Sequence, residues 1–432
     1  MNAPAAATTG LPTRGFARSL PSLLVLALST LLGFTMMGSF ATVQEAAKAE
    51  LALSDYALSL VTGVSAAVPL LLLSIPIGVA VDRFHRVRIL LALAVLWTAG
   101  TWLTAFASSV PVLFVARMMT ALGMAGALTA AVSISADLCE PAQRGRANLI
   151  VNLGKIGGQA SAFALAGALF ALFAGADAPR WFGALAPWRA THLALAIIGT
   201  VLLLPLALLR EPARREIEAG PRASFRTLAR ELWARRAFLA PLFAGQMSIV
   251  MADSTAGIWA APVLTRKFGL QPGDFAGWMG LLLLTAGLAG SVLGGLGADW
   301  GMRRGRRGGL LLGAVLAAAL GIPAALFPAA GSVPVFAVAL GTLATCGAVT
   351  GLVMAVALTV YLPNELRGLT IGAFIALAGL FGFGVAPPLV AAASDLMGGE
   401  ARLPDALAMV AVLTSVLGLA GFALAMRRAP VR

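Results

Sequence analysis

Charge and cysteine are scarce in this sequence. Only 11% of its 432 residues are charged, whereas 59% are hydrophobic, and it contains two cysteines and two histidines. So little polar surface cannot cover a soluble core of this size, which excludes a soluble globular protein. Two cysteines without metal-ligand spacing exclude a disulfide framework. We expect Cys139 and Cys346 to be buried thiols.

The motifs of common enzymes are also missing. The sequence has no Gly-x-x-x-x-Gly-Lys-Ser/Thr loop to hold a phosphate and no Gly-x-Ser-x-Gly elbow. It has no cluster of histidines, cysteines and acids at metal-binding spacing. We therefore expect a protein that is not an enzyme and that uses no cofactor and no metal.

Long apolar runs are what the sequence has in abundance. A run of about 20 residues crosses a hydrocarbon layer about 30 Å thick as a helix. Twelve such runs predict an all-α membrane protein with twelve transmembrane helices, at 20–43, 57–81, 88–109, 111–137, 147–173, 190–209, 237–262, 275–298, 309–329, 332–361, 369–393 and 404–426. The first run follows Arg14 and Arg18, is too long for a signal peptide and lacks a cleavage site.

The basic residues predict the orientation of these helices. The net charge is +13, and with the N-terminus inside, 23 Lys and Arg fall on the cytoplasmic side and 6 on the other. This bias is the positive-inside rule, so both termini are expected to be cytoplasmic and the protein to be multi-pass in the cell's inner (plasma) membrane. Because the excess charge has a topological explanation, we do not expect a nucleic-acid partner.

The chain repeats itself at an offset of 217 residues. "LSDYALSLVTG" (53–63) aligns with "LQPGDFAGWMG" (270–280), and the same offset places Gly78 on Gly295, Asp82 on Asp299 and Arg86 on Arg303. This repeat predicts two pseudo-symmetric six-helix bundles, 1–210 and 237–432, with a substrate site between them near the membrane midplane.

A cytoplasmic linker, 211–236, joins the two bundles. Ser224 is positioned to cap a short helix with Phe225, Leu228 and Leu232 on one face. The flanking arginines are compatible with an amphipathic helix on an anionic leaflet, and equally with a solvated linker helix.

The run Gly78-x-x-x-Asp82-Arg83-x-x-Arg86-x-Arg88 resembles the signature of the major facilitator superfamily, and the resemblance extends over nearly the whole chain. "VARMMTALGMAG" and "LGGLGADW" are most similar to the bacterial branch related to Spinster-like transporters. The resemblance implies a transporter that works by alternating access.

The charged connection after the second span is the predicted inner gate. Gly78 would let two helices approach closely, and the Asp82 carboxylate would meet a helix N-terminus or an arginine. In the resembled family such a cluster holds the halves together while the site faces outward. We assign the gating role to Gly78, Asp82, Arg83, Arg86, Arg88, Asp137, Arg144, Asp299 and Arg303. For Asp137 and Arg144 the alternative is ordinary loop charge.

Arg117 is the first of three ionisable residues predicted inside a span, where charge is costly and usually functional. Its context "ARMMTALG" resembles the superfamily's fourth-helix motif, which implies substrate or proton handling. The alternative is an arginine bonded to backbone carbonyls that fastens helices together. Spinster-like relatives carry a Glu seven residues later, where this chain has Met124, so their coupling mechanism is not expected here.

Lys155 is predicted about 13 Å inside the fifth span, too deep to extend easily to either interface. Facing the central cavity, it would attract an anionic group. Asn152 and Gln159, at i−3 and i+4, lie on the same helix face and would hydrogen-bond a ligand. The alternative is an internal partner acid.

Asp253 is predicted near the middle of the seventh span, with Gln246 two turns earlier on the same face. A carboxylate there could exchange a proton with either side, or it could be the fixed partner of Lys155 or Arg117. Glu45, where the first span leaves the membrane, carries no functional signal in the sequence.

Two cations against one anion at midplane favour a monomeric, proton-coupled symporter of a small organic anion. Lys155, Arg117, Asn152, Gln159 and Gln246 are the predicted substrate-binding residues and Asp253 the proton-coupling residue. The alternatives are a Spinster-like transporter of lysolipids or other amphiphiles, an exporter of hydrophobic compounds, and a membrane sensor that transports nothing.

Overall fold

The computed structural model describes residues 16–140, 143–175, 185–214, 225–303, 305 and 307–430. Arg14 and Ser224, which were named above, lie outside these residues, and so do the side chains of Phe225 and Leu228. The short linker helix predicted there is present as α8 (Phe225–Ala234).

Twelve helical spans within the described residues are long and apolar enough to cross a membrane, as the apolar runs predicted. They are α1 (Phe16–Leu51), α2 (Asp55–Ser59) with η1 (Leu60–Val64) and α3 (Ser65–Arg83), α4 (Arg86–Phe106), α5 (Val110–Leu138), α6 (Arg144–Ala174), α7 (Pro187–Ala207), α9 (Arg236–Phe268), α10 (Pro272–Arg303), η3 (Gly309–Leu311) with α11 (Leu312–Ala324) and η4 (Phe327–Ala329), α12 (Val333–Tyr361), α13 (Asn364–Ala378) with η5 (Gly379–Val385) and α14 (Ala386–Leu396), and η6 (Glu400–Arg402) with α15 (Leu403–Arg428).

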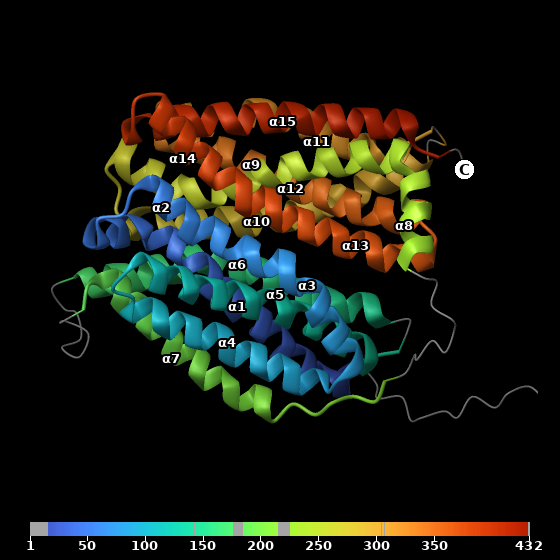
Figure 1. The fold of residues 1–432 in the computed structure, drawn as a ribbon, viewed down its shortest axis with the longest axis horizontal. Helices are drawn as coiled ribbons and strands as arrows, with labels where there is room; N and C mark the ends of the chain where they lie inside the picture. Colours follow the sequence, from blue (N-terminus) through green and yellow to red (C-terminus); the bar gives the residue numbers. More distant parts are fainter. Residues whose placement is uncertain are drawn as a thin grey trace, which may run out of the picture.

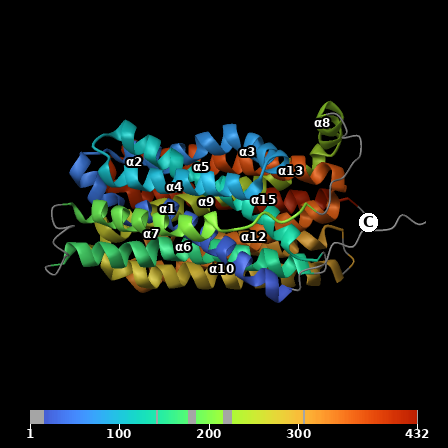
Figure 2. The same cartoon turned by 90° about the horizontal axis from the view of Figure 1, so that it is seen from below.

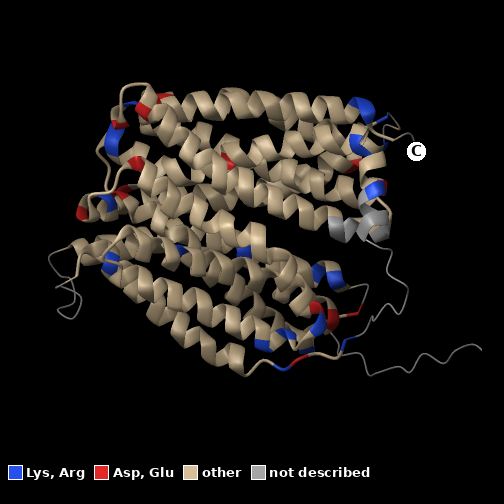
Figure 3. Ribbon diagram, viewed as in Figure 1, with Lys and Arg blue, Asp and Glu red and all other residues tan. Residues whose placement is uncertain are grey.

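The spans form two bundles, with α1 to α7 in the N-terminal half and α9 to α15 in the C-terminal half (Figures 1 and 2). We call the end of the molecule that carries α8 and the C-terminus the linker end, and the opposite end the α2 end. Most charged residues gather at these two ends, and the band between them contains only a few (Figure 3). The predicted fold, twelve spans in two six-helix bundles, is confirmed.

Glycines bring helices into backbone contact within each half. On α6, a Cβ at Gly154 would lie 2.2 Å from the Ala27 oxygen, and one at Gly158 would lie 2.4 Å from the Leu31 oxygen, both on α1. Lipid tails are as apolar as leucine, so helices in a bilayer associate through such close packing of small residues.

Two further close contacts join the halves, and they involve glycines that the 217-residue repeat aligns. A Cβ on Gly63 of η1 would lie 2.4 Å from the Phe383 oxygen of η5. A Cβ on Gly280 of α10 would lie 2.7 Å from the Ala160 oxygen of α6. The repeat therefore aligns two glycines that each lie in a contact between the halves.

Both partners in the first of these contacts are π-helical. η1 spans Leu60–Val64 and η5 spans Gly379–Val385, and η5 is followed directly by Pro387 at the start of α14. Such wide turns are rare and concentrate at functional sites. Here they lie in the two spans that meet across the interface.

The close approach expected at Gly78 is wrong for this structure. A Cβ there would meet nothing within 4 Å, and its repeat partner Gly295 would meet only one Leu352 methyl group, at 3.8 Å. The reason is that the halves touch nearer the α2 end, at Gly63 and Gly280. Cys139 and Cys346 are buried, as predicted, and neither forms a disulfide within the described residues.

Candidate functional site

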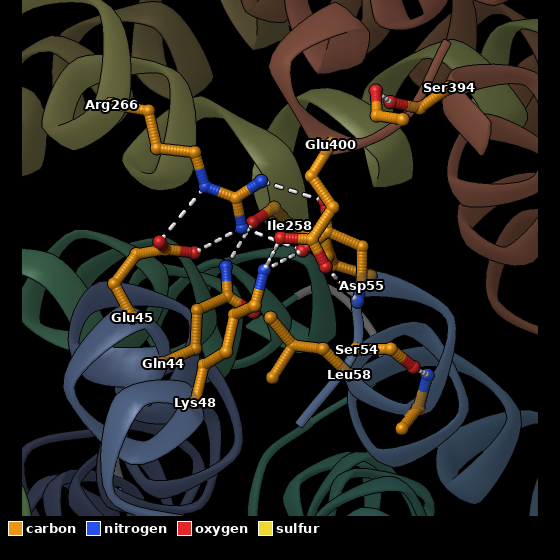
Figure 4. Close-up of polar contacts among 12 residues, drawn as sticks. Gln44, Glu45, Lys48, Ser54, Asp55, Leu58, Ile258, Arg266, Ser394 and Glu400 are labelled. Atoms are coloured by element: carbon orange, nitrogen blue, oxygen red, sulfur yellow. Dashed lines mark hydrogen bonds and ion pairs between the residues drawn. The ribbon is translucent and has the colours of Figure 1, made fainter. Parts of the chain in front are cut away.

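A cluster of five charged residues, Glu45, Lys48, Asp55, Arg266 and Glu400, joins the two halves at the α2 end (Figure 4). We call it the α2-end cluster. Arg266 of α9 donates to Glu45 through Nε at 2.9 Å and Nη2 at 2.7 Å. It also donates to Asp55 through Nη1 and Nη2, each at 2.7 Å. One guanidinium thus binds two carboxylates of the other half.

Lys48 and Glu400 add a second connection within this cluster. The Lys48 ammonium donates to Asp55 Oδ1 at 2.6 Å and to the carboxylate of Glu400. The backbone N–H of Asp55, the first residue of α2, donates to Glu400 Oε1 at 3.1 Å. Beside the cluster, Gln44 donates through Nε2 to the Ile258 oxygen at 2.5 Å.

The α2-end cluster holds the halves together through short, charge-assisted bonds, the stronger class of hydrogen bond. The Asp55 side chain is 1% exposed, so its charge is compensated by Lys48 and Arg266 rather than by water. Among pairs of described side chains, the ion pairs that join the halves lie at this end. The α2 end is closed in this structure.

Sequence reasoning missed this cluster. Glu45 was assigned no functional signal, and the other four residues were not singled out; the structure corrects this, because Glu45 pairs with Arg266. The partners lie 211 and 221 residues apart in the chain, so no local pattern reveals them. A weak signal did exist, since Lys48 and Arg266 are among the six basic residues on the side where few are expected.

At the linker end, the predicted gating residue Arg86 pairs within the N-terminal half. Its Nη1 lies 2.5 Å from Asp137 Oδ2, and its Nε donates to Glu211 Oε1 at 2.8 Å. The N–H of Val87 donates to Glu211 Oε2 at 2.8 Å. The carboxylate that meets a helix N-terminus and an arginine is therefore that of Glu211, whereas the Asp82 side chain, expected in this place, is exposed.

Glu211 lies beyond the end of α7, outside the spans. Burial by itself would raise the pKa of the Glu211 carboxyl, but hydrogen bonds from Arg86 and the Val87 N–H outweigh it. The pKa is held below its ordinary value of 4.5. Three residues later, Arg214 donates to the oxygens of Val81, Asp82 and Phe84 and so caps the end of α3.

The remaining predicted gating residues do not join the halves through the contacts described. Arg144 donates through Nε to the Ala136 oxygen at 3.1 Å, within its own half. Arg83 and Arg88 are exposed. Asp299 and Arg303 are exposed along one hollow of α10, which Trp300 and Leu296 also line.

Arg117 lies inside the N-terminal half. Its guanidinium donates to the backbone oxygens of Met36, at 3.2 Å, and Met37, and it lies 5.3 Å from the centre of the Phe40 ring. Arg117 is 2% exposed. These contacts are those of the alternative considered for Arg117, a residue that fastens α5 to α1.

Lys155 is half-buried on α6, and its ammonium lies 5.9 Å from the centre of the Phe34 ring. None of the described carboxylates forms an ion pair with it, so the partner acid considered for Lys155 is not found among them. Asn152 and Gln159, on the same helix face, are exposed as expected. An uncompensated cation and two amides therefore share one open face of α6.

Asp253 is half-buried at the middle of α9, in the other half. Its Oδ1 atom is buried without a hydrogen-bond partner among the described residues, and it pairs with neither Lys155 nor Arg117. Gln246 is 3% exposed, and its Oε1 likewise has no described partner. Lys155 in one half and Asp253 in the other thus lie within spans without an ion-pair partner among the described side chains, and Gln246 is enclosed.

The family model described as Major Facilitator Superfamily matches residues 24–387. The chain belongs to this superfamily. It is similar in structure to a bacterial homologue of the human lysosomal transporter Spinster in an inward-facing, unoccupied conformation, with a TM-score of 0.82, 22% identity and coverage of 96% of this chain and 98% of that one. It is also similar to a D-xylose–proton symporter, with a TM-score of 0.65, 18% identity and coverage of 92% and 97%.

A nucleoside transporter matches with a TM-score of 0.72 at 13% identity, covering 93% of this chain and 99% of that one. The resemblance seen in the signature after the second span is confirmed, and the Spinster homologue agrees with the branch that the motifs indicated. Members of the superfamily are transporters that act on small molecules in the membrane. At these identities the structural likeness shows the shared fold.

Proposed function

We propose that this member of the Major Facilitator Superfamily is a secondary active transporter that carries a small organic anion together with protons. The observation that supports this most is Lys155, a cation at mid-span with no described partner acid. An unpaired charge inside a membrane protein is costly, so it is retained where a ligand completes it. A carboxylate or similar group of the substrate would do so.

The substrate would bind between the halves. Lys155 attracts the anionic group, and Asn152 and Gln159 donate or accept hydrogen bonds on the same face of α6. Arg117 contributes indirectly, because it fixes the positions of Met36 and Met37 on α1 beside this face. Gln246 would become a ligand only in a state in which α9 has moved.

Asp253 would carry the proton. Its Oδ1 atom is buried without a described hydrogen-bond partner, and a carboxyl group that gains and loses a proton between states can couple proton flow to transport. Because Asp253 lies in the opposite half from Lys155, moving the halves apart exposes the two groups to water together.

In alternating access, the two ends of the molecule would close in turn, the α2 end in one state and the linker end in the other. The basic excess supports a cytoplasmic linker end; the closed α2 end would then face outward, and the structure would correspond to an inward-facing state. Opening the outer side requires the α2-end cluster to separate. The halves would then meet at the linker end, near the half-buried Gly78. Asp82, Arg83, Arg88, Asp299 and Arg303 are exposed there, and Arg86, Asp137 and Arg144 would take part from their present positions.

A ligand screen by thermal unfolding tests this assignment. A ligand at 100 times its dissociation constant stabilises the folded state by about 2.7 kcal/mol and so raises the Tm. Purified wild type, Lys155→Ala and Lys267→Ala are heated with sugar acids, mono- and dicarboxylates, lysolipids and hydrophobic cations. Lys267 is the matched control because its ammonium donates to the Pro328 oxygen outside the proposed site.

We expect an organic anion to raise the Tm of wild type and Lys267→Ala but not that of Lys155→Ala. Stabilisation of all three proteins by lysolipids or cations alone would contradict the proposal. It would favour the second candidate, a transporter of amphiphiles. That candidate is supported by the aromatic ring of Phe34 beside Lys155, which suits an apolar chain next to an anionic headgroup.

A further inference from the structure

A glycine of α12 lies directly against the carboxylate of Asp253. A Cβ atom on Gly347 would lie 1.9 Å from Asp253 Oδ2, 2.5 Å from Cγ and 2.6 Å from Oδ1. Real Cβ atoms essentially never come within 3.0 Å of another heavy atom. The whole carboxylate therefore occupies the space that a side chain at position 347 would fill.

This contact differs from the glycine packing elsewhere in the C-terminal half. Gly290 and Gly294 of α10 face the backbone oxygens of Thr345 and Val349, so they allow two helices to approach. At Gly347 the three nearest atoms all belong to one carboxylate, and no backbone atom of α9 is among them. The absence of a side chain at Gly347 therefore makes room for the Asp253 carboxylate, whereas at Gly290 and Gly294 it makes room for the backbone of a neighbouring helix.

The surroundings hold this part of α12 in place. Gly347 is buried, its oxygen accepts a hydrogen bond from the Thr350 hydroxyl at 3.0 Å, and Cys346 beside it is 5% exposed. The carboxylate rests against this fixed apolar surface, and its Oδ1 has no described hydrogen-bond partner. Such a position suits a carboxylic acid and disfavours a carboxylate anion.

We propose that Gly347 is a positioning residue for Asp253. The missing side chain at position 347 lets the protonated carboxyl group lie against α12, withdrawn from the path between the halves, and so determines where the proton is held. The significance of that place for transport rests on the proposed function. The contact itself does not.

Two glycines one helical turn apart make a matched pair of variants. Gly347→Ala forces the carboxyl group off α12, toward water between the halves. Gly351→Ala adds the same methyl group to the same helix, but a Cβ there meets nothing within 4 Å. A general effect of alanine on α12 would appear in both variants, whereas displacement of Asp253 appears only in the first.

Infrared spectroscopy of the purified protein reads the carboxyl group directly. We expect wild type and Gly351→Ala to show the C=O stretch of a carboxylic acid without a hydrogen bond, assigned to Asp253 by its loss in Asp253→Asn. In Gly347→Ala this band should move to lower frequency or disappear, as the group reaches water. An unchanged band in Gly347→Ala, or no such band in wild type, would overturn the proposal.

A double-mutant cycle on thermal stability gives a second readout. Gly347→Ala should lower the Tm in the wild-type background but not in an Asp253→Ala background, where removal of the carboxylate makes room for the new methyl group. Equal losses in both backgrounds would show that the methyl group clashes with something else. Neither experiment needs a substrate, so a failed ligand screen and a failed positioning role are distinguishable.

Discussion

At the scale of single residues, ionisable groups with ion-pair partners lie at the two ends of the molecule, and Lys155 and Asp253, which have none among the described side chains, lie between them. Glu211, Arg86 and Asp137 form a closed set at the linker end, and Asp55 and Arg266 do so at the α2 end. Lys155 and Asp253, in the middle, have no such partners among the described side chains. Paired charges favour a particular arrangement of helices, and the proposed function assigns the unpaired ones to a ligand and a proton.

Glu211 makes a testable contribution to stability. Glu211→Gln removes one charged partner from Arg86, which should cost about 1–3 kcal/mol at neutral pH. Because the folded-state pKa lies below the ordinary value of 4.5, this stabilisation is present above pH 4.5 and is lost as the pH falls through the folded-state pKa. Thermal unfolding between pH 7 and pH 4 measures the difference.

Asp82→Asn is the control for this experiment, because the Asp82 side chain is exposed. We expect it to change the Tm by much less than Glu211→Gln at pH 7. A Tm difference between wild type and Glu211→Gln that stays constant down to pH 4 would show that the ion pair is not its cause.

Which of these residues the sequence reveals depends on the range of their interactions. Lys155, Asn152 and Gln159 could be placed on one helix face because the helical period is local. Twelve spans could be counted because an apolar run is local too. Glu45 and Arg266 are paired only by the way two distant helices meet, and Glu211 takes the place expected of Asp82 because the chain after α7 returns to the start of α4.

At the scale of helices, the two interfaces between the halves rely on glycines that correspond in the repeat, Gly63 and Gly280. The repeat itself was visible in the sequence. The sequence did not show which of the repeated glycines would lie between the halves. The motif drew attention to Gly78, but a Cβ there has no close neighbour in this state. Backbone contact at Gly63 and Gly280 explains why the halves rest on each other in the part of the membrane nearest the α2 end.

Widening one of these contacts should open the α2 end. Gly280→Val places methyl groups against the Ala160 oxygen and Ala164, an overpacking that costs about 1–3 kcal/mol. Gly277→Val, one turn earlier on α10, is the control, because a Cβ there meets nothing within 4 Å. Spin labels at positions 56 and 396, exposed on opposite halves, report the separation of the α2 end.

We expect Gly280→Val to add a population with longer distances between the labels, and Gly277→Val to match wild type. If both variants give the wild-type distances, the α6–α10 contact does not keep this end closed.

At the scale of the whole molecule, the proposed alternating access makes the closed α2 end and the groups at mid-span features of one of two states. The α2-end cluster stabilises this state, and the charged connections at the linker end are the candidates for stabilising the other. A substrate shifts such an equilibrium only through a difference in its affinity for the two states. In the proposed function, Lys155 and Asp253, on opposite halves, provide that difference.

Uptake of the anion found in the ligand screen into proteoliposomes tests the central claim most directly. With a proton gradient imposed across the membrane, we predict that wild type accumulates the labelled anion above its equilibrium level and that Lys155→Ala takes up none. Asp253→Asn should exchange the anion but lose gradient-driven accumulation. Accumulation by wild type that is the same with and without the gradient, or undiminished uptake by Lys155→Ala, would contradict proton-coupled transport of an organic anion through this site.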